Sequence, residues 1–375
     1  MISELILLND FKRQWSETRS DVLAAVERVG GSGWYVLGTG VASFERALAT
    51  RMQLRFAVGC ASGLDAIEIG LRVLGLPAGA RVLTTPLSAF ATTLAIVRAG
   101  CVPVFADVDR HGHLDLALCA RILAERADVR ALVPVHLYGQ PMDLGGLADI
   151  KRRFPVRVIE DCAQSIDARF AGRAAGTVGD LAATSFYPTK NLGALGDGGA
   201  VLTDDEGLRT AASALRNYGQ SRRYVHDRLG LNSRLDEVQA AILEAAQLPR
   251  LDAWTARRRQ VAARYLAGIR HPGVRLPAPA ARAEPVWHLF PIVVAPDKRD
   301  SLQAHLRASG VETAVHYPTL IPEQEALAGV TFEVIGELPR ARELAGGEVS
   351  IPIHPYLSDD EADRVVAAVN GWSAP

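Results

Sequence analysis

Two side chains could do chemistry together: a carboxylate that ends one predicted strand, and a lysine in the loop after the next strand. PVRVIEDCAQS indicates an apolar strand that ends at Asp161, with Gln164 just beyond it. LAATSFY indicates a second short strand, and the Pro- and Gly-rich PTKNLGALGDGG that follows cannot continue it as strand or helix. Lys190 therefore lies on a shaped loop.

Lys190 has two interpretations. A loop lysine is most often a solvated surface charge. A lysine also forms Schiff bases with carbonyl compounds when burial or a neighbouring cation lowers its pKa. Asp161 favours the second interpretation, because pyridoxal phosphate needs an aspartate for its pyridinium nitrogen and a lysine for its aldehyde. The pair predicts a pyridoxal phosphate site in which Asp161 and Lys190 are catalytic.

A phosphate site is predicted where a short strand at 56–58 turns into a helix, in FAVGCASGLDAIEIGLRVLG. Ser62 and Asp65 suit the N-cap and the capping box of that helix. The free N–H groups and the partial positive charge of a helix N-terminus bind phosphate. Taken alone, the segment favours an ordinary capped helix over a phosphate site.

The elements that position these residues alternate along the chain. ARVLTTP, CVPVFADVD, ALVPVHLYG, VRVIED and LAATSFY are apolar strands, most of them separated by helical sequence. This alternation predicts an α/β fold with a large, doubly wound, mostly parallel sheet, in which ligands gather at the carboxyl ends of the strands. Candidate residues at or just after those ends are Phe90, Asp107, His136, Asp161 and Ser185. Phe90 suits either the core or a stacking position over a flat ring.

The second half of the chain changes character. A basic loop, NYGQSRRYVHDRLGLNSRLDEVQ, leads into a helix for which Ser233 and Asp236 indicate another capping box. Pro249 separates this helix from the next, in which the run Arg257–Arg259 is expected to form a solvated face.

A smaller α+β domain is predicted to follow a Pro- and Ala-rich connector that begins near residue 270. WHLFPIVV and EVSIPIHP indicate strands, SLQAHLRASG indicates a helix, and a last helix begins near Ser358. We therefore divide the chain into a large domain, 1–250, and a small C-terminal domain, 251–375.

Composition narrows the class of partner. The 375 residues carry 41 Lys plus Arg and 42 Asp plus Glu, a net charge of -1, which argues against nucleic acid as a partner. The sequence shows neither a bilayer-spanning segment nor a basic secretory signal, so we expect a cytoplasmic protein that does not bind membranes. The spacing of the four cysteines indicates buried thiols and no metal site.

Taken together, the motifs resemble the fold type I pyridoxal phosphate enzymes and, within them, the nucleotide-sugar aminotransferases of the DegT and StrS group. ASGLDAI, EDCAQS, SFYPTKNLGALGDGGA, GLNSRLDEVQAAIL and AVHYP follow the family's order and spacing, and the likeness covers nearly the whole chain. The resemblance implies that Lys190 bonds to the cofactor aldehyde, Asp161 pairs with the ring nitrogen, and Gln164 approaches the ring oxygen. It implies that the phosphate is bound by Ser62, Gly63, Leu64 and Ser185. It also implies that Phe90 covers the cofactor ring.

The same resemblance implies a homodimer with shared active sites, because Asn232 of the G-x-N-x-R motif reaches the phosphate bound by the neighbouring subunit. It also implies transfer of an amino group from an amino acid, such as L-glutamate, to a keto-deoxysugar nucleotide. Leu64, in the usual Thr position, and Gly-Asp in place of Gly-Glu are similar to the subgroup that aminates C3 of a dTDP-3-keto-6-deoxyhexose. In that subgroup His316 and Tyr317 lie close to the bound sugar.

Several alternatives stay open on the sequence. A 4-keto sugar or a keto-cyclitol could be the amino acceptor, and a non-catalytic sensor of the same fold could bind the sugar nucleotide. Lys190 argues against the sugar dehydratases of the group, which commonly carry histidine at that position. A dinucleotide-binding reductase is disfavoured, because no strand is followed by G-x-G-x-x-G.

Overall fold

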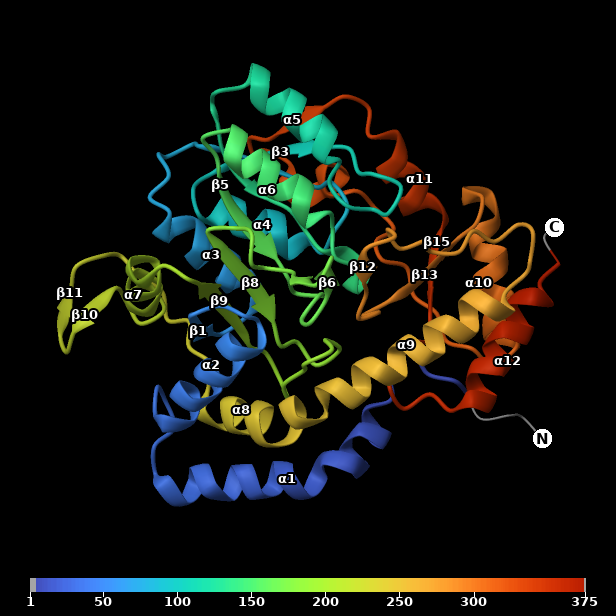
Figure 1. Ribbon diagram of the computed structural model, residues 1–375, viewed down its shortest axis with the longest axis horizontal. Helices are drawn as coiled ribbons and strands as arrows, with labels where there is room; N and C mark the ends of the chain where they lie inside the picture. Colours follow the sequence, from blue (N-terminus) through green and yellow to red (C-terminus); the bar gives the residue numbers. More distant parts are fainter. Residues whose placement is uncertain (1–4, 374–375) are drawn as a thin grey trace.

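The computed structural model describes residues 5–373, and its centre is an eight-stranded sheet (Figure 1). The strand order is β1-β9-β8-β5-β4-β2-β3-β14. The bounds are β1 Phe56–Cys60, β2 Arg81–Thr84, β3 Val102–Ala106, β4 Val129–Val133, β5 Arg157–Asp161, β8 Leu181–Ser185, β9 Gly199–Thr203 and β14 Glu333–Ile335. The strands from β14 to β8 pair in parallel, and β9 runs antiparallel to both of its neighbours, β8 and β1. The predicted mostly parallel sheet is confirmed.

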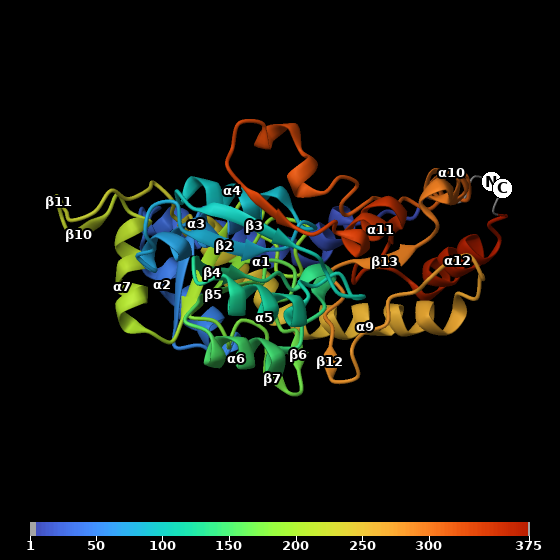
Figure 2. The ribbon, with the colours of Figure 1, turned by 90° about the horizontal axis from the view of Figure 1, so that it is seen from above.

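Helices cover both faces of this sheet, as a doubly wound fold requires. Figure 2 shows α3 (Gly63–Val73) and α4 (Phe90–Arg98) on one face, and α5 (Leu116–Glu125) and α6 (Leu144–Arg153) on the other. α3 buries Ile67 and Leu71 in an apolar cluster with residues of the sheet. Two further helices, α2 (Thr39–Arg51) and α7 (Glu206–Leu215), pack near the β1 and β9 edge of the sheet.

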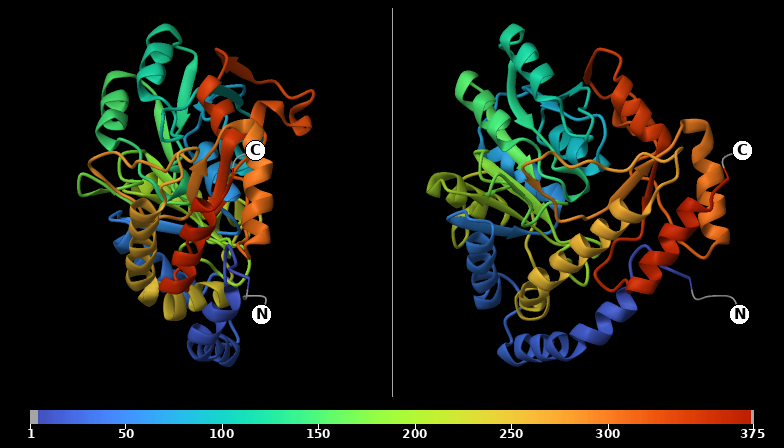
Figure 3. Two further views of the ribbon diagram at one scale, coloured as in Figure 1. Left: turned by 90° about the vertical axis from the view of Figure 1, so that its right-hand side faces the viewer. Right: turned by 45° about the vertical axis from the view of Figure 1, so that its right-hand side comes forward.

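A helical layer lies below the sheet in Figure 1. It consists of α1 (Phe11–Ser32), α8 (Glu237–Ile242) and α9 (Leu251–Gly268). Val22 and Val29 of α1 pack against Ile242 of α8 in a single apolar cluster. Figure 3 shows α1 lying along the outside of the molecule. Phe11 and Trp15 of α1 are both exposed.

The C-terminal region forms its own core around a two-stranded antiparallel sheet. β13 (Phe290–Val293) pairs with β15 (Glu348–Ile351), and α10 (Arg299–Ala308), α11 (Pro339–Gly347) and α12 (Asp359–Asn370) lie around them. Ser358 caps α12 through a complete capping box. The short strands elsewhere are β6 Arg169–Phe170, β7 Arg173–Ala174, β10 Gln220–Arg222, β11 Val225–His226 and β12 Ala283–Glu284. The division at residue 250 stays a prediction; β14, from beyond it, joins the large sheet.

Two local expectations are corrected. Arg258 does not belong to a solvated face: it is 5% exposed, and its Nη1 donates to the carbonyls of Trp287 and Ile353, both at 3.1 Å. Ser233 does not cap α8, which begins at Glu237 after Asp236 with no side-chain cap. The four cysteines are buried free thiols, as expected. None of the helices within residues 5–373 has the length and apolar character needed to cross a membrane.

Candidate active site

Asp161 ends β5 inside the molecule, where its carboxylate has two protein donors. Oδ1 accepts the backbone N–H of Ala163 at 3.0 Å, and Oδ2 accepts the hydroxyl of Thr92 at 2.9 Å. Burial raises the pKa of Asp161, and the two hydrogen bonds oppose that shift by stabilising the charged form. A buried carboxylate with oriented donors is suited to hold a cation, such as a protonated ring nitrogen, beside it.

Lys190 lies in the loop between β8 and β9, which folds back on itself. The N–H of Lys190 donates to the carbonyl of Tyr187 at 2.8 Å, and the N–H of Ala194 donates to the carbonyl of Phe186 at 2.8 Å. Within residues 5–373 the Lys190 amine has no hydrogen-bond partner, although the charge of Asp161 acts on it. Burial lowers the pKa of Lys190 to about 8. An amine with a pKa lowered in this way is neutral in part near pH 8, and the neutral form can attack an aldehyde.

The predicted phosphate site is a helix N-terminus packed closely against β8. Ser62 is the N-cap of α3, and its Oγ accepts the N–H of Asp65 at 3.1 Å, which leaves the N–H groups of Gly63 and Leu64 without an intrahelical acceptor. A Cβ at Gly63 would lie 2.6 Å from the Cβ of Ser185, so only glycine allows this approach. Two orphan donors beside a serine hydroxyl fit a phosphate group.

The predicted capping box at this helix is wrong. Asp65 does not return a hydrogen bond to the cap, because its Oδ2 accepts the hydroxyl of Ser233 at 2.7 Å. The Ser233 Oγ in turn accepts the N–H of Ala61 at 3.1 Å. Ser233, expected to cap another helix, instead fixes the turn that precedes the phosphate site.

Phe90 is the first residue of α4, two positions before Thr92. Its ring is half-buried and packs against an apolar cluster that contains Phe105, Ile321 and Leu327. The core contact foreseen for Phe90 is therefore present, and its role as a cover for the cofactor ring stays a prediction. The helix start that presents Phe90 also delivers the Thr92 hydroxyl to Asp161.

Gln164, His316 and Tyr317 are brought together by a hydrogen-bond network. Gln164 Nε2 donates to the hydroxyl of Tyr317 at 3.2 Å, and its Oε1 accepts the N–H of Tyr138 at 2.6 Å. The hydroxyl of Tyr138 donates to the carbonyl of His316 at 2.6 Å. Burial and then the charge of Lys190 lower the pKa of His316 to about 4, so its ring is neutral near pH 7. The AVHYP motif is thus tied to the site around Asp161 and Lys190.

Asn232, the remaining predicted cofactor residue, directly precedes Ser233, whose hydroxyl holds the turn before the predicted phosphate site. Its side chain is exposed, and it has no hydrogen-bond partner among the described residues. Its backbone pairs with Asn217 in an isolated bridge.

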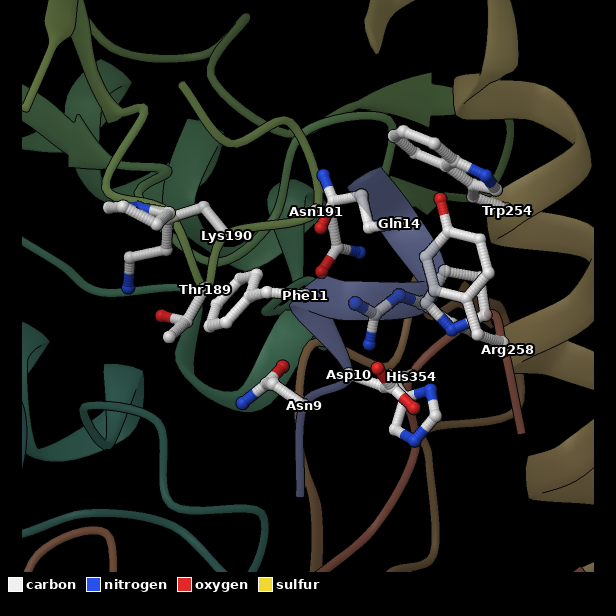
Figure 4. A pocket seen from close by; sticks show the side chains of 13 residues that line it. Asn9, Asp10, Phe11, Gln14, Thr189, Lys190, Asn191, Trp254, Arg258 and His354 are labelled. Carbon is white, nitrogen blue, oxygen red and sulfur yellow. The ribbon is translucent and has the colours of Figure 1, made fainter. Parts of the chain in front are cut away.

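Other residues near Lys190 were not foreseen from the sequence. Nδ1 of His288 lies 3.3 Å from Oδ1 of Asn191, and burial, then Lys190, hold the pKa of His288 well below its usual value. A small pocket beside the lysine loop is lined by Lys190 itself, by Asn191 and Arg258, and by residues 9–11 and Gln14. Figure 4 shows the Lys190 side chain running away from Arg258 in that view. Helical spacing in α9 was the available signal for Arg258, whereas His288 and Asn191 carried none.

The parallel sheet, the helix N-terminus at its edge and the aspartate–lysine pair define the class of protein: a fold type I enzyme that uses pyridoxal phosphate. The sequence matches the DegT/DnrJ/EryC1/StrS aminotransferase family over residues 16–370, and the chain belongs to that family.

Known relatives match along nearly their whole length. The chain is 42% identical to dTDP-3-amino-3,4,6-trideoxy-alpha-D-glucose transaminase of Streptomyces venezuelae, covering 97% of this chain and 95% of the relative. It is also 42% identical to erythromycin biosynthesis sensory transduction protein EryC1 of Saccharopolyspora erythraea, covering 96% and 97%. Among solved structures, S. venezuelae DesV in complex with a ketimine intermediate matches with a TM-score of 0.93 and 41% identity, covering 99% of both chains.

Proposed function

We propose that the protein moves an amino group from an amino acid, L-glutamate, to C3 of a dTDP-linked 3-keto-6-deoxyhexose. The observation that carries this proposal is the end-to-end similarity to a relative named as a dTDP-3-amino-sugar transaminase. The aspartate–lysine pair and the orphan N–H groups at the start of α3 support the same chemistry.

In this proposal Asp161 and Lys190 are the catalytic residues. Bound pyridoxal phosphate supplies the electron sink that allows a proton to leave the Cα of an amino acid. Asp161, held by Thr92 and Ala163, keeps a proton on the ring nitrogen. The Lys190 amine takes the proton from Cα, and its lowered pKa of about 8 leaves part of it neutral and able to do so. Gly63 and Leu64 bind the phosphate through their N–H groups.

The experiment uses purified protein loaded with pyridoxal phosphate. It is offered dTDP-linked 3-keto- and 4-keto-6-deoxyglucose in separate reactions with L-glutamate, 2-oxoglutarate is measured, and the new nitrogen is located by NMR. The proposal expects 2-oxoglutarate and amination at C3 from the first sugar alone. Amination at C4, without turnover of the 3-keto sugar, would reject the C3 assignment and keep the transaminase. A keto-cyclitol serves as a third acceptor.

A sensor function is the second candidate, because one relative bears the name of a sensory transduction protein. A sensor would bind the nucleotide sugar without producing 2-oxoglutarate. The reactions described above measure 2-oxoglutarate, and calorimetry measures binding of the nucleotide sugar. Binding without 2-oxoglutarate indicates a sensor, and production of 2-oxoglutarate indicates a transaminase.

We also propose a homodimer in which Asn232 serves the phosphate bound by the partner subunit. Support comes from the exposed, unpartnered Asn232 and from the exposed apolar residues of α1 and the following loop, among them Phe11, Trp15 and Trp34. The test refolds an equal mixture of Lys190→Ala and Asn232→Ala subunits, each inactive alone. Half of the resulting dimers are mixed and each holds one intact site, so about a quarter of wild-type activity should return. No recovery, or a monomer in solution, would contradict shared sites.

A further inference from the structure

Two buried side chains, the carboxyl group of Glu348 and the hydroxyl of Ser350, contact His316 of the AVHYP motif. They contact its backbone N–H and Nδ1, and leave Nε2 without a partner among the described residues. Glu348 and Ser350 lie two positions apart on β15, so their side chains share one face of the strand. The Ser350 Oγ lies 2.5 Å from Oε1 of Glu348 and 2.9 Å from Nδ1 of His316. The Glu348 Oε2 accepts the backbone N–H of His316 at 2.6 Å. Both β15 side chains are fully buried.

Counting hydrogens shows that this chain has two states. The Ser350 hydroxyl has one hydrogen and can donate it either to Glu348 or to Nδ1 of His316. If Glu348 is ionised, Ser350 donates to it, and Nδ1 of His316 must then carry a hydrogen and donate to Ser350. If Glu348 is protonated, it donates to Ser350, Ser350 donates to Nδ1, and the imidazole hydrogen lies on Nε2. The proton on Glu348 therefore decides the tautomer of neutral His316.

The surroundings of Glu348 favour its protonated form. Burial raises the pKa of Glu348 to about 8, against the opposing effect of its hydrogen bonds and of Arg299. Arg299, on α10, directs a guanidinium nitrogen to the carbonyl of Ala345 at 2.8 Å and makes no ion pair with Glu348. Besides His316, the phenols of Tyr138 and Tyr317 are affected by the charge of Glu348, and their raised pKa values keep them neutral.

We infer that Glu348 and Ser350 are positioning residues that hold His316 with its ring hydrogen on Nε2 and so make it a hydrogen-bond donor toward the substrate. Nε2 has no partner among the described residues, and the ring lies near enough to Lys190 to feel its charge. The substrate role rests on the proposed function, whereas the tautomer does not.

The donor tautomer matches the chemistry of a keto sugar. A carbonyl oxygen has only lone pairs and accepts a hydrogen bond from Nε2–H, while the other tautomer would present a lone pair to it. The Nε2–H group can also donate a hydrogen bond to a hydroxyl of the sugar ring or to the carboxylate of the amino acid that supplies the amino group. A sugar whose carbonyl oxygen is left without a hydrogen-bond donor in this half-buried site binds less tightly. The tautomer of His316 therefore affects how well the site binds the keto sugar.

The test reads the tautomer directly in the cofactor-loaded protein without any sugar. The nine histidines are labelled with ¹⁵N, and His316→Gln identifies the signals of His316 in long-range ¹H–¹⁵N spectra. Between pH 6 and 7 the wild type should show hydrogen on Nε2, and above about pH 8 the signals should move to the Nδ1–H form, as Glu348 ionises. Glu348→Gln donates through its amide as the protonated acid does, so it should keep the Nε2–H form at every pH.

A wild type that carries the Nδ1 hydrogen near pH 7, or that shows no tautomer change up to pH 9.5, would overturn the inference. The same transition in Glu348→Gln would overturn it equally. Ser350→Ala, with its melting temperature checked, should lose the transition because the relay is cut.

A kinetic arm tests the substrate role. The KM for the keto sugar should rise about 3- to 10-fold in the wild type above pH 8 relative to Glu348→Gln, with kcat changed less. A pH-driven tautomer change without this KM effect would keep the relay and remove its role in substrate binding. Absence of any transaminase activity would reject the proposed function and leave the NMR result standing.

Discussion

Thr92→Val removes one of the two protein donors to the buried Asp161 carboxylate while preserving side-chain shape. The lost hydrogen bond, 2.9 Å long, ends on a charged oxygen inside the molecule. Hydrogen bonds to charged groups contribute about 1.5–3 kcal/mol, and one pKa unit corresponds to about 1.4 kcal/mol. We therefore expect the pKa of Asp161 to rise further by about one to two units, because its ionised form loses that stabilisation.

The loss of ionised Asp161 should weaken cofactor binding, because the ionised carboxylate pairs with the protonated ring nitrogen of the cofactor. Titration of apo-protein with pyridoxal phosphate, followed by absorbance at a pH low enough that Asp161 is mostly protonated in both apo-proteins, should give a dissociation constant about 10- to 100-fold higher than in the wild type. A matched control is next in sequence: Thr93 is fully buried, and its hydroxyl has no hydrogen-bond partner within residues 5–373. Thr93→Val should bind the cofactor normally and be as stable as the wild type or more so. Equal cofactor affinity in the two variants would refute the assignment of Thr92.

Three further predictions test other parts of the site. Lys190→Ala should abolish amino transfer yet fold and bind pyridoxamine phosphate, and normal turnover would remove Lys190 from the mechanism. Gly199→Ala should weaken cofactor binding about tenfold or more, because the new Cβ would lie 2.4 Å from the carbonyl of Ser62, whereas Gly30→Ala, which meets nothing within 4 Å, should bind normally. Uptake of pyridoxal phosphate by the apo-protein should quicken about tenfold per pH unit below pH 8 and then level off, because only neutral Lys190 attacks; a rise continuing to pH 10 would contradict the lowered pKa of about 8.

The sequence predicted those features that depend on neighbouring residues. The apolar run that ends at Asp161 and the small residues after Cys60 define strand ends and a helix start locally, and both occur in the structure. Local patterns also misled where a distant residue competes. Asp65 fits a capping box in sequence, yet Ser233, far along the chain, takes its carboxylate.

The residues that were missed depend on tertiary pairing. Thr92 contacts Asp161 although two strands, β3 and β4, lie between them in the sequence. Ser350 contacts His316 because residues 314 and 350 pair in an isolated bridge. Three successive arginines suggested a solvated face, but Arg258 shares the buried side of α9 with Trp254 and Val261. Helical periodicity around that run was the signal that could have corrected this interpretation.

The central claim is amino transfer to C3 of a nucleotide-linked keto sugar, and one half-reaction tests it most directly. The protein is converted to its pyridoxamine phosphate form, freed of amino acid, and mixed with dTDP-3-keto-6-deoxyglucose. We predict one nitrogen transferred per site, located at C3 by NMR, together with return of the pyridoxal phosphate absorbance. A stable pyridoxamine phosphate spectrum with unchanged sugar, while the 4-keto sugar is aminated, would contradict the claim.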